Sequence, residues 1–165
     1  MARKVFFSFH YKPDSWRAAK VRNMGLVEGN APVSDNDWEK VKGGGDAAIK
    51  KWITGQLSGK SCAVVLIGAE TASRKWVRHE IVEAWNAKKG VVGIHINKIE
   101  DHNGKQGTKG ANPLDKIDYR DSGKKLSSIA KVYTPSGTTS KEAYDWIKEH
   151  LANAVKDAIR IRNEN

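Results

Sequence analysis

The chain has 165 residues, the usual size of one domain and enough to bury a hydrophobic core. Its hydrophobic share of 39% argues against an intrinsically disordered chain, and no apolar run approaches the ~20 residues that a transmembrane helix needs. The net charge of +10 is spread along the chain without a basic tail, so it does not by itself indicate nucleic-acid binding. From its length we expect one domain, residues 1–165. The single cysteine excludes an internal disulfide, and for this reason we expect the protein in the reducing cytoplasm.

The first part of the chain alternates strand-like and helix-like segments. β-branched and aromatic residues over 5–9 predict a first strand, and the turn and capping residues that follow predict a helix over about 15–23. The next stretch is rich in Gly, Asn, Pro and Asp and predicts a loop, in which only 31–34 has the composition of a short strand. After three consecutive glycines, apolar residues at helical spacing predict a helix over about 46–58.

The middle of the chain contains the clearest element. Residues 61–67 are apolar without alternation, which is typical of a central parallel strand covered on both faces. An apolar stripe at Val77 and Ile81 predicts the helix that follows, and Gly90 ends it. A second buried strand is predicted over 91–96.

The last part of the chain begins with a long polar excursion over 97–125, in which Asn112-Pro113-Leu114 is the one fixed point. A weak strand near 129–133 follows, and an amphipathic C-terminal helix is predicted over 140–162. The whole pattern predicts an α/β fold. We expect a mainly parallel, five-stranded sheet in the flavodoxin-like order, with 61–67 next to 5–9 at its centre.

Ligands of open parallel sheets bind at the carboxyl ends of the strands, so candidate site residues are sought there. Three segments should meet at that edge: the tip of the first strand at 9–11, the loop at 35–38, and the helix start with Trp76 and Glu80. Trp76 and Glu80 are four residues apart and therefore share a helix face. They could form a sugar-binding pair, or they could be a packing residue and a solvated charge. The spacing alone does not decide between these interpretations.

Several segments resemble one family. Residues 73–80, S-R-K-W-V-R-H-E, look like the W-x-x-x-E segment of TIR domains, and 3–11, R-K-V-F-F-S-F-H-Y, look like their opening strand. Further blocks are C-A-V-V-L-I-G at 62–68, G-I-H-I-N at 93–97 and K-G-A-N-P-L-D at 109–115. In this combination the chain is most similar to the bacterial TIR-like family that includes the sensor enzyme of the Thoeris anti-phage system.

The resemblance implies a flavodoxin-like three-layer TIR fold and the cleavage of NAD+ with release of nicotinamide. In the Thoeris branch it implies a cyclic ADP-ribose signal, which a downstream effector senses, and it allows self-association. NAD+ would be the substrate, and no separate cofactor is expected. Cleavage builds positive oxocarbenium character on the ribose carbon, which a nearby carboxylate stabilises. Glu80 is the expected catalytic residue.

The remaining candidates are assigned around Glu80, and no metal site is expected. The candidate substrate-binding residues are Phe9, His10, Asp35, Trp38, Trp76 and Arg78. Phe9 or Trp76 could stack on nicotinamide or adenine, and Arg78 or backbone N–H groups at a helix start could bind pyrophosphate oxygens. We interpret His95, inside a predicted strand, as a satisfied core or edge residue, and Cys62 as a small buried residue.

Two other functions stay open. The first alternative is a non-catalytic TIR-like scaffold or interaction module in signalling, in which Glu80 is only a surface charge. The second is a nucleic-acid-binding module that uses the diffuse positive charge. We rank the enzyme first, the scaffold second and nucleic-acid binding third, and we expect no membrane partner.

Overall fold

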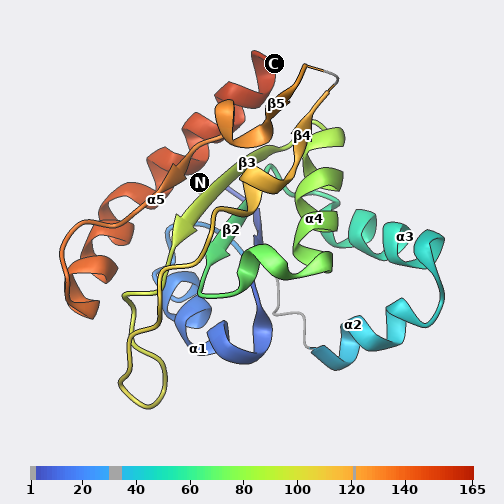
Figure 1. Ribbon diagram of the computed structural model, residues 1–165. Helices are drawn as coiled ribbons and strands as arrows, with labels where there is room; N and C mark the ends of the chain where they lie inside the picture. Colours follow the sequence, from blue (N-terminus) through green and yellow to red (C-terminus); the bar gives the residue numbers. More distant parts are fainter. Residues whose placement is uncertain (1–2, 30–34, 121) are drawn as a thin grey trace.

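The computed structural model describes residues 3–29, 35–120 and 122–165, and for 35–38 it describes the backbone alone. Figure 1 shows a sheet with helices on both sides. The helices and strands, in chain order, are β1 (Val5–Ser8), α1 (Tyr11–Arg22), α2 (Asp35–Lys42), α3 (Asp46–Leu57), β2 (Cys62–Ile67), η1 (Thr71–Ser73), α4 (Lys75–Asn86), β3 (Gly90–His95), η2 (Pro113–Lys116), β4 (Asp118–Tyr119), β5 (Lys124–Lys125), η3 (Leu126–Ser128), β6 (Val132–Tyr133) and α5 (Ser140–Asn163).

The central sheet has four parallel strands in the order β1-β2-β3-β6. All six residues of β2 are buried, as expected for a strand that neighbouring strands and helices cover on every side. The register pairs Ser8 with Val65 and Ile67 with His95, so the three long strands end close to one another. The predicted α/β fold, the mainly parallel sheet and the neighbouring positions of 61–67 and 5–9 are confirmed.

The sheet has four strands in the described residues instead of the predicted five, and a single parallel bridge between Lys4 and Glu28 lies beside it. The backbone N–H of Val5 donates to the carbonyl of Glu28 at 2.8 Å, and the N–H of Glu28 donates to the carbonyl of Arg3 at 2.9 Å. The bridge lies beside β1 on the side away from β2, where the flavodoxin-like order places its second strand. The short strand predicted over 31–34 lies outside the described residues.

Two hydrophobic clusters, one on each face of the sheet, pack the sheet between two layers of helices. One cluster joins the sheet to α1 and α5, through residues such as Val21, Leu151 and Val155. The other joins it to α3 and α4, through residues such as Ile53 and Ile81. Figure 1 shows α5 on one side of the sheet and α3 and α4 on the other. The predicted three-layer arrangement is therefore confirmed.

Two helices differ from the expectation. α1 begins at Tyr11, four residues before the predicted start, because Pro13 is accommodated in its first turn, where its missing N–H removes no helical hydrogen bond. Asp14, one of the turn and capping residues expected just before the helix, instead forms a buried ion pair with Arg17 at 2.9 Å. α2 lies where a loop was expected; it has only eight residues, too few to show a clear apolar period.

The excursion over 97–125 crosses the sheet edge and is tied down at two places. The Arg17 guanidinium donates from Nε to the carbonyl of Ile99 at 2.6 Å and from Nη2 to the carbonyl of Lys105 at 2.9 Å. Leu114, at the predicted fixed point, is fully buried, and its N–H donates to the side chain of Asn112 at 2.9 Å. The excursion thus has specific anchors on α1 and on the core.

The C-terminal helix predicted over 140–162 is confirmed as α5. The Thr139 hydroxyl accepts from the N–H of Glu142, and the Glu142 carboxylate accepts in return, which forms a capping box. The helix buries one apolar stripe against the sheet. No helix in the described ranges combines the length and the apolar character that crossing a bilayer requires.

Candidate active site at the carboxyl edge of the sheet

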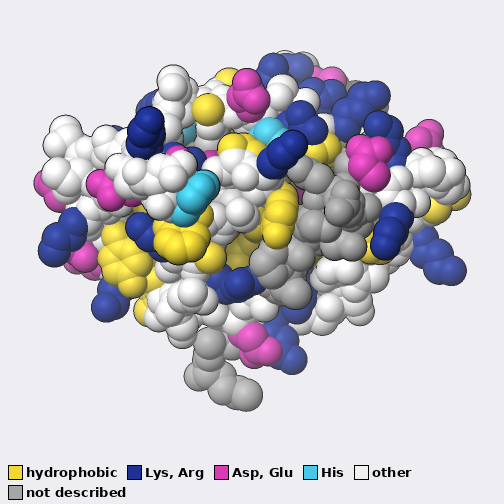
Figure 2. All heavy atoms as spheres, turned by 90° about the horizontal axis from the view of Figure 1, so that it is seen from below, with side chains coloured by type: hydrophobic (Ala, Val, Ile, Leu, Met, Phe, Trp, Pro, Cys, Tyr) yellow, Lys and Arg dark blue, Asp and Glu magenta, His cyan; other side chains and the backbone are white. Residues whose placement is uncertain are grey.

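The site is built where β1 ends and α4 begins. Side chains of a strand alternate between its two faces, so Ser8 lies on the same face as Phe6, which packs in the α3 and α4 cluster. In Figure 1, β2 and β3 point downward and the chain turns into α4 at that lower edge. Figure 2 views this edge from below and shows hydrophobic and histidine side chains near the middle of the face, with Lys and Arg around them.

Glu80 lies in the first half of α4 with its side chain turned inward. The residue is only 4% exposed, and its Oε1 accepts a hydrogen bond from the Ser8 hydroxyl at 3.1 Å. This contact joins two segments that are 72 residues apart in the sequence. Glu80 is therefore not a solvated helix charge, which was one of the two interpretations that the spacing left open.

The environment of Glu80 favours its protonated form. Burial raises the pKa of this carboxyl to about 8, and the hydrogen bond from Ser8 acts in the opposite direction. Groups with strongly perturbed pKa values are concentrated at functional sites. A cationic group placed beside Glu80 would lower its pKa again and stabilise the carboxylate.

Aromatic and basic side chains lie next to this carboxyl at the start of α4. His10 is buried, and its ring lies edge-on to the Trp76 ring with centroids 6.1 Å apart. The Arg74 guanidinium also lies over the Trp76 ring, 4.3 Å from the centroid. Trp76 and Glu80 share a helix face, so the structure brings His10, Trp76 and Glu80 to one corner of the sheet edge, as predicted.

Two predicted residues take other directions. Phe9 packs against the α1 and α5 cluster and stacks on Tyr11 with centroids 6.3 Å apart, on the sheet face opposite to Ser8. Arg78 is exposed, and helical geometry puts it roughly 200° around α4 from both Trp76 and Glu80. The structure therefore does not bring Phe9 or Arg78 together with Glu80.

The backbone of Asp35 and Trp38 belongs to α2, but their side chains lie outside the described residues. Their assignment to substrate binding stays a prediction.

Two residues of this corner, Ser8 and Arg74, were not among the candidates predicted from the sequence. Ser8 could have been found, because the alternation of the first strand puts it on the same face as the buried Phe6. Arg74 gave no such signal, since nothing local predicts that a residue before a helix stacks on a ring two positions later. Both were identified only through their contacts.

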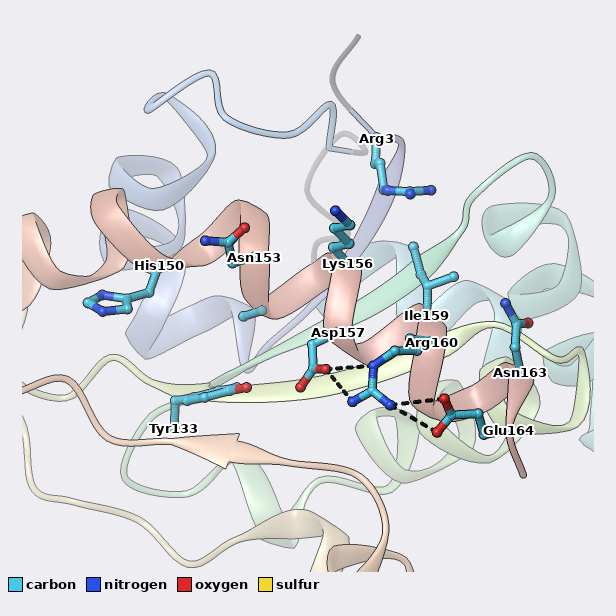
Figure 3. A pocket seen from close by; sticks show the side chains of 11 residues that line it. Arg3, Tyr133, His150, Asn153, Lys156, Asp157, Ile159, Arg160, Asn163 and Glu164 are labelled. Atoms are coloured by element: carbon cyan, nitrogen blue, oxygen red, sulfur yellow. Dashed lines mark hydrogen bonds and ion pairs between the residues drawn. The ribbon is translucent and has the colours of Figure 1, made fainter.

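Two other kinds of site, a metal centre and a cavity, could lie elsewhere among the described residues. Among those residues, no three His, Cys, Asp or Glu side chains are grouped so that they could hold a metal ion. A cavity of about 720 Å³ lies along α5 and includes none of the candidate residues (Figure 3). Its Arg160 is already bound by Asp157 and Glu164, as the dashed lines show.

Comparison with known proteins assigns the chain to a family. Residues 6–101, more than half of the chain, match the family model described as "Thoeris protein ThsB, TIR-like domain". This range includes Ser8, His10, Trp76 and Glu80. The chain is also 41% identical over 167 residues to a protein of Bacillus cereus (strain MSX-D12) named "Putative cyclic ADP-D-ribose synthase ThsB1", covering 97% of this chain and 85% of that protein. The chain therefore belongs to the family of the TIR-like domain of the Thoeris protein ThsB.

Proposed function

We propose that this protein cleaves NAD+ between nicotinamide and ribose and makes a cyclic ADP-ribose that signals in anti-phage defence. The observation that supports this most directly is the buried Glu80 carboxyl, held by Ser8 beside Trp76 and His10 at the carboxyl edge of a parallel sheet. The 41% identical relative is named as a putative synthase of cyclic ADP-D-ribose, the kind of product proposed here.

The reaction follows from the charges. When the bond between the ribose carbon and the nicotinamide nitrogen breaks, its electron pair goes to the nicotinamide, which leaves as a neutral molecule. The ribose carbon then develops positive oxocarbenium character, which the Glu80 carboxylate stabilises. The leaving group is cationic before cleavage and needs no proton, so a single carboxylate suffices. Attack by an atom of the same molecule gives a cyclic product, and attack by water, which loses a proton to the solvent, gives ADP-ribose.

The raised pKa of Glu80 is compatible with this role. In the protein alone, burial favours the neutral acid. The positive charge of the nicotinamide ring favours the carboxylate, so binding of NAD+ would release a proton from Glu80 at neutral pH. The negative charge of the Glu80 carboxylate would then lie close to the reacting carbon, in surroundings from which most water is excluded.

The scaffold alternative loses its main support. That alternative takes Glu80 as a surface charge, but the residue is 4% exposed and bonded to Ser8. Burying a carboxyl in this way costs stability, a cost that an exposed surface charge would not carry. The proposal further includes a downstream effector that senses the product, self-association of the chain, and a cytoplasmic location.

The proposal is tested by product analysis. Cells that express the wild-type chain or Glu80→Gln are infected with phage, and their nucleotides are analysed by mass spectrometry. We expect nicotinamide and a cyclic ADP-ribose to accumulate with the wild type alone. Equal amounts of both products in the two cultures would refute the proposal. Addition of NAD+ to the activated, purified protein checks that the reaction is its own.

A further inference from the structure

A second group of side chains lies at the same edge of the sheet, on the far side of β2 from Ser8. His95 is the last residue of β3 and pairs in register with Ile67, the last residue of β2. Strand alternation puts His95 on the face of Val91, which packs in the α3 and α4 cluster. His95 and Glu80 therefore belong to the same face and the same edge of the sheet.

His95 is buried without being satisfied. It is only 5% exposed, and its Nδ1 has no hydrogen-bond partner within the described ranges. The expectation that His95 is a satisfied core residue is thus wrong for this nitrogen. Buried polar atoms almost always have a partner, and each exception calls for an explanation. A ligand that supplies the missing partner is one such explanation.

The long excursion brings a positive charge to the same place. Gly110 approaches the end of β2 so closely that a Cβ on it would lie 2.1 Å from the carbonyl oxygen of Gly68, so only glycine fits there. The neighbouring residue, Lys109, is exposed, and its charge reaches His95. Burial, aided by that charge, lowers the pKa of His95 to about 4. The imidazole is therefore neutral at neutral pH and can donate one hydrogen bond.

We propose that His95 and Lys109 bind the pyrophosphate of the dinucleotide, His95 by donating a hydrogen bond from Nδ1 and Lys109 by its charge. This inference rests on the proposed function. The pyrophosphate is the only anionic part of NAD+, and its nicotinamide end is cationic. Glu80, bonded to Ser8 on one side of β2, and Lys109, whose charge acts on His95 on the other side, would orient these two ends, with the cationic end at the carboxylate.

The test uses ADP-ribose as a probe, because it contains the pyrophosphate and lacks the nicotinamide. Its dissociation constant is measured by calorimetry for the wild type, His95→Leu and Lys109→Ala. We expect His95→Leu to weaken binding roughly 10- to 100-fold, as for the loss of a hydrogen bond to a charged group. Lys109→Ala should weaken it by about 10-fold or less and reduce the salt dependence of binding. His102→Leu and Lys148→Ala, which change an exposed residue of each kind, are the matched controls.

Two further measurements distinguish binding from a structural role. With NAD+, His95→Leu should raise KM far more than it lowers kcat, whereas the turnover of nicotinamide riboside, which has no phosphate, should not change. The melting temperature of His95→Leu should equal or exceed that of the wild type, because the substitution removes an unsatisfied buried atom. A structural histidine would lower it instead.

The inference is overturned if His95→Leu binds ADP-ribose as the wild type does, or if its effects on NAD+ and nicotinamide riboside are equal. It is separable from the proposed function. A wild type that binds ADP-ribose through His95 but never releases nicotinamide from NAD+ would refute the enzyme and leave this binding site intact.

Discussion

Glu80→Gln should have opposite effects on activity and on stability. The substitution keeps the shape and the acceptor for Ser8 but removes the ionisable group. Loss of the carboxylate at the developing positive charge should lower kcat by on the order of 10²–10³, or about 3–4 kcal/mol. If Glu80 were an exposed helix charge, its substitution would change the free energy of unfolding by about 0.5 kcal/mol or less and would not affect turnover.

The stability effect follows from the raised pKa of the buried carboxyl. The pKa of Glu80 is about 8 in the folded protein, whereas an unperturbed glutamate, as in the unfolded chain, has a pKa of 4.5. The folded state binds the proton more tightly, so this group contributes stability that is fully present below pH 4.5 and is lost as the pH rises towards 8. The loss is at most about 1.4 kcal/mol per pH unit. Glu80→Gln removes it.

We therefore expect Glu80→Gln to be more stable than the wild type at pH 7, by on the order of 1–3 kcal/mol, with little difference near pH 4.5. For a chain of this size the gain corresponds to a rise in Tm of roughly 3–10 °C. Urea unfolding at several pH values measures the difference, and nicotinamide release from NAD+ by the activated protein measures turnover. Glu149→Gln, an exposed change on α5, controls for the altered net charge.

Two results would refute this reasoning separately. Wild-type turnover by an activated Glu80→Gln would remove Glu80 from the catalytic role. A stability difference that does not grow between pH 5 and 8 would contradict the raised pKa, whatever happens to turnover.

Three further predictions concern the surroundings of the site and the core. Ser8→Ala removes the hydrogen bond that favours the charged form of Glu80, so kcat should fall about 10-fold and the acid limb of the pH–rate profile should move to higher pH. An unshifted pH–rate profile would contradict the contact between Ser8 and Glu80. Arg17→Leu leaves the Asp14 carboxyl buried without its cation and should lower the free energy of unfolding by about 3–5 kcal/mol. In the double variant, Asp14→Asn should restore part of this loss. A loss below about 1 kcal/mol in urea unfolding would show that the buried pair is dispensable. Burial raises the pKa of the Cys62 thiol to about 12, so thiol reagents should modify the native protein only as fast as it unfolds, and rapid labelling at pH 8 would contradict this.

Local sequence patterns determined the strands and most helices. The uninterrupted apolar run of β2 predicted a strand covered on both faces, because only such a strand buries every side chain. The four-residue spacing of Trp76 and Glu80 predicted a shared helix face, because helical periodicity is a local property. The resemblance to TIR domains singled out Glu80 as the expected catalytic residue; the family assignment confirms the resemblance, and the role of Glu80 stays a prediction.

The tertiary structure alone decided the environment of each candidate. Glu80 becomes a buried acid with a raised pKa only because Ser8, 72 residues away, and the core of α4 close over it. The same holds for His95, whose unsatisfied nitrogen depends on what the excursion places around it. Periodicity reports which way a side chain points along its own element, whereas burial, charge and hydrogen bonding depend on segments that are distant in the sequence. For this reason the sequence could name Glu80 but could not show that its surroundings favour the protonated acid.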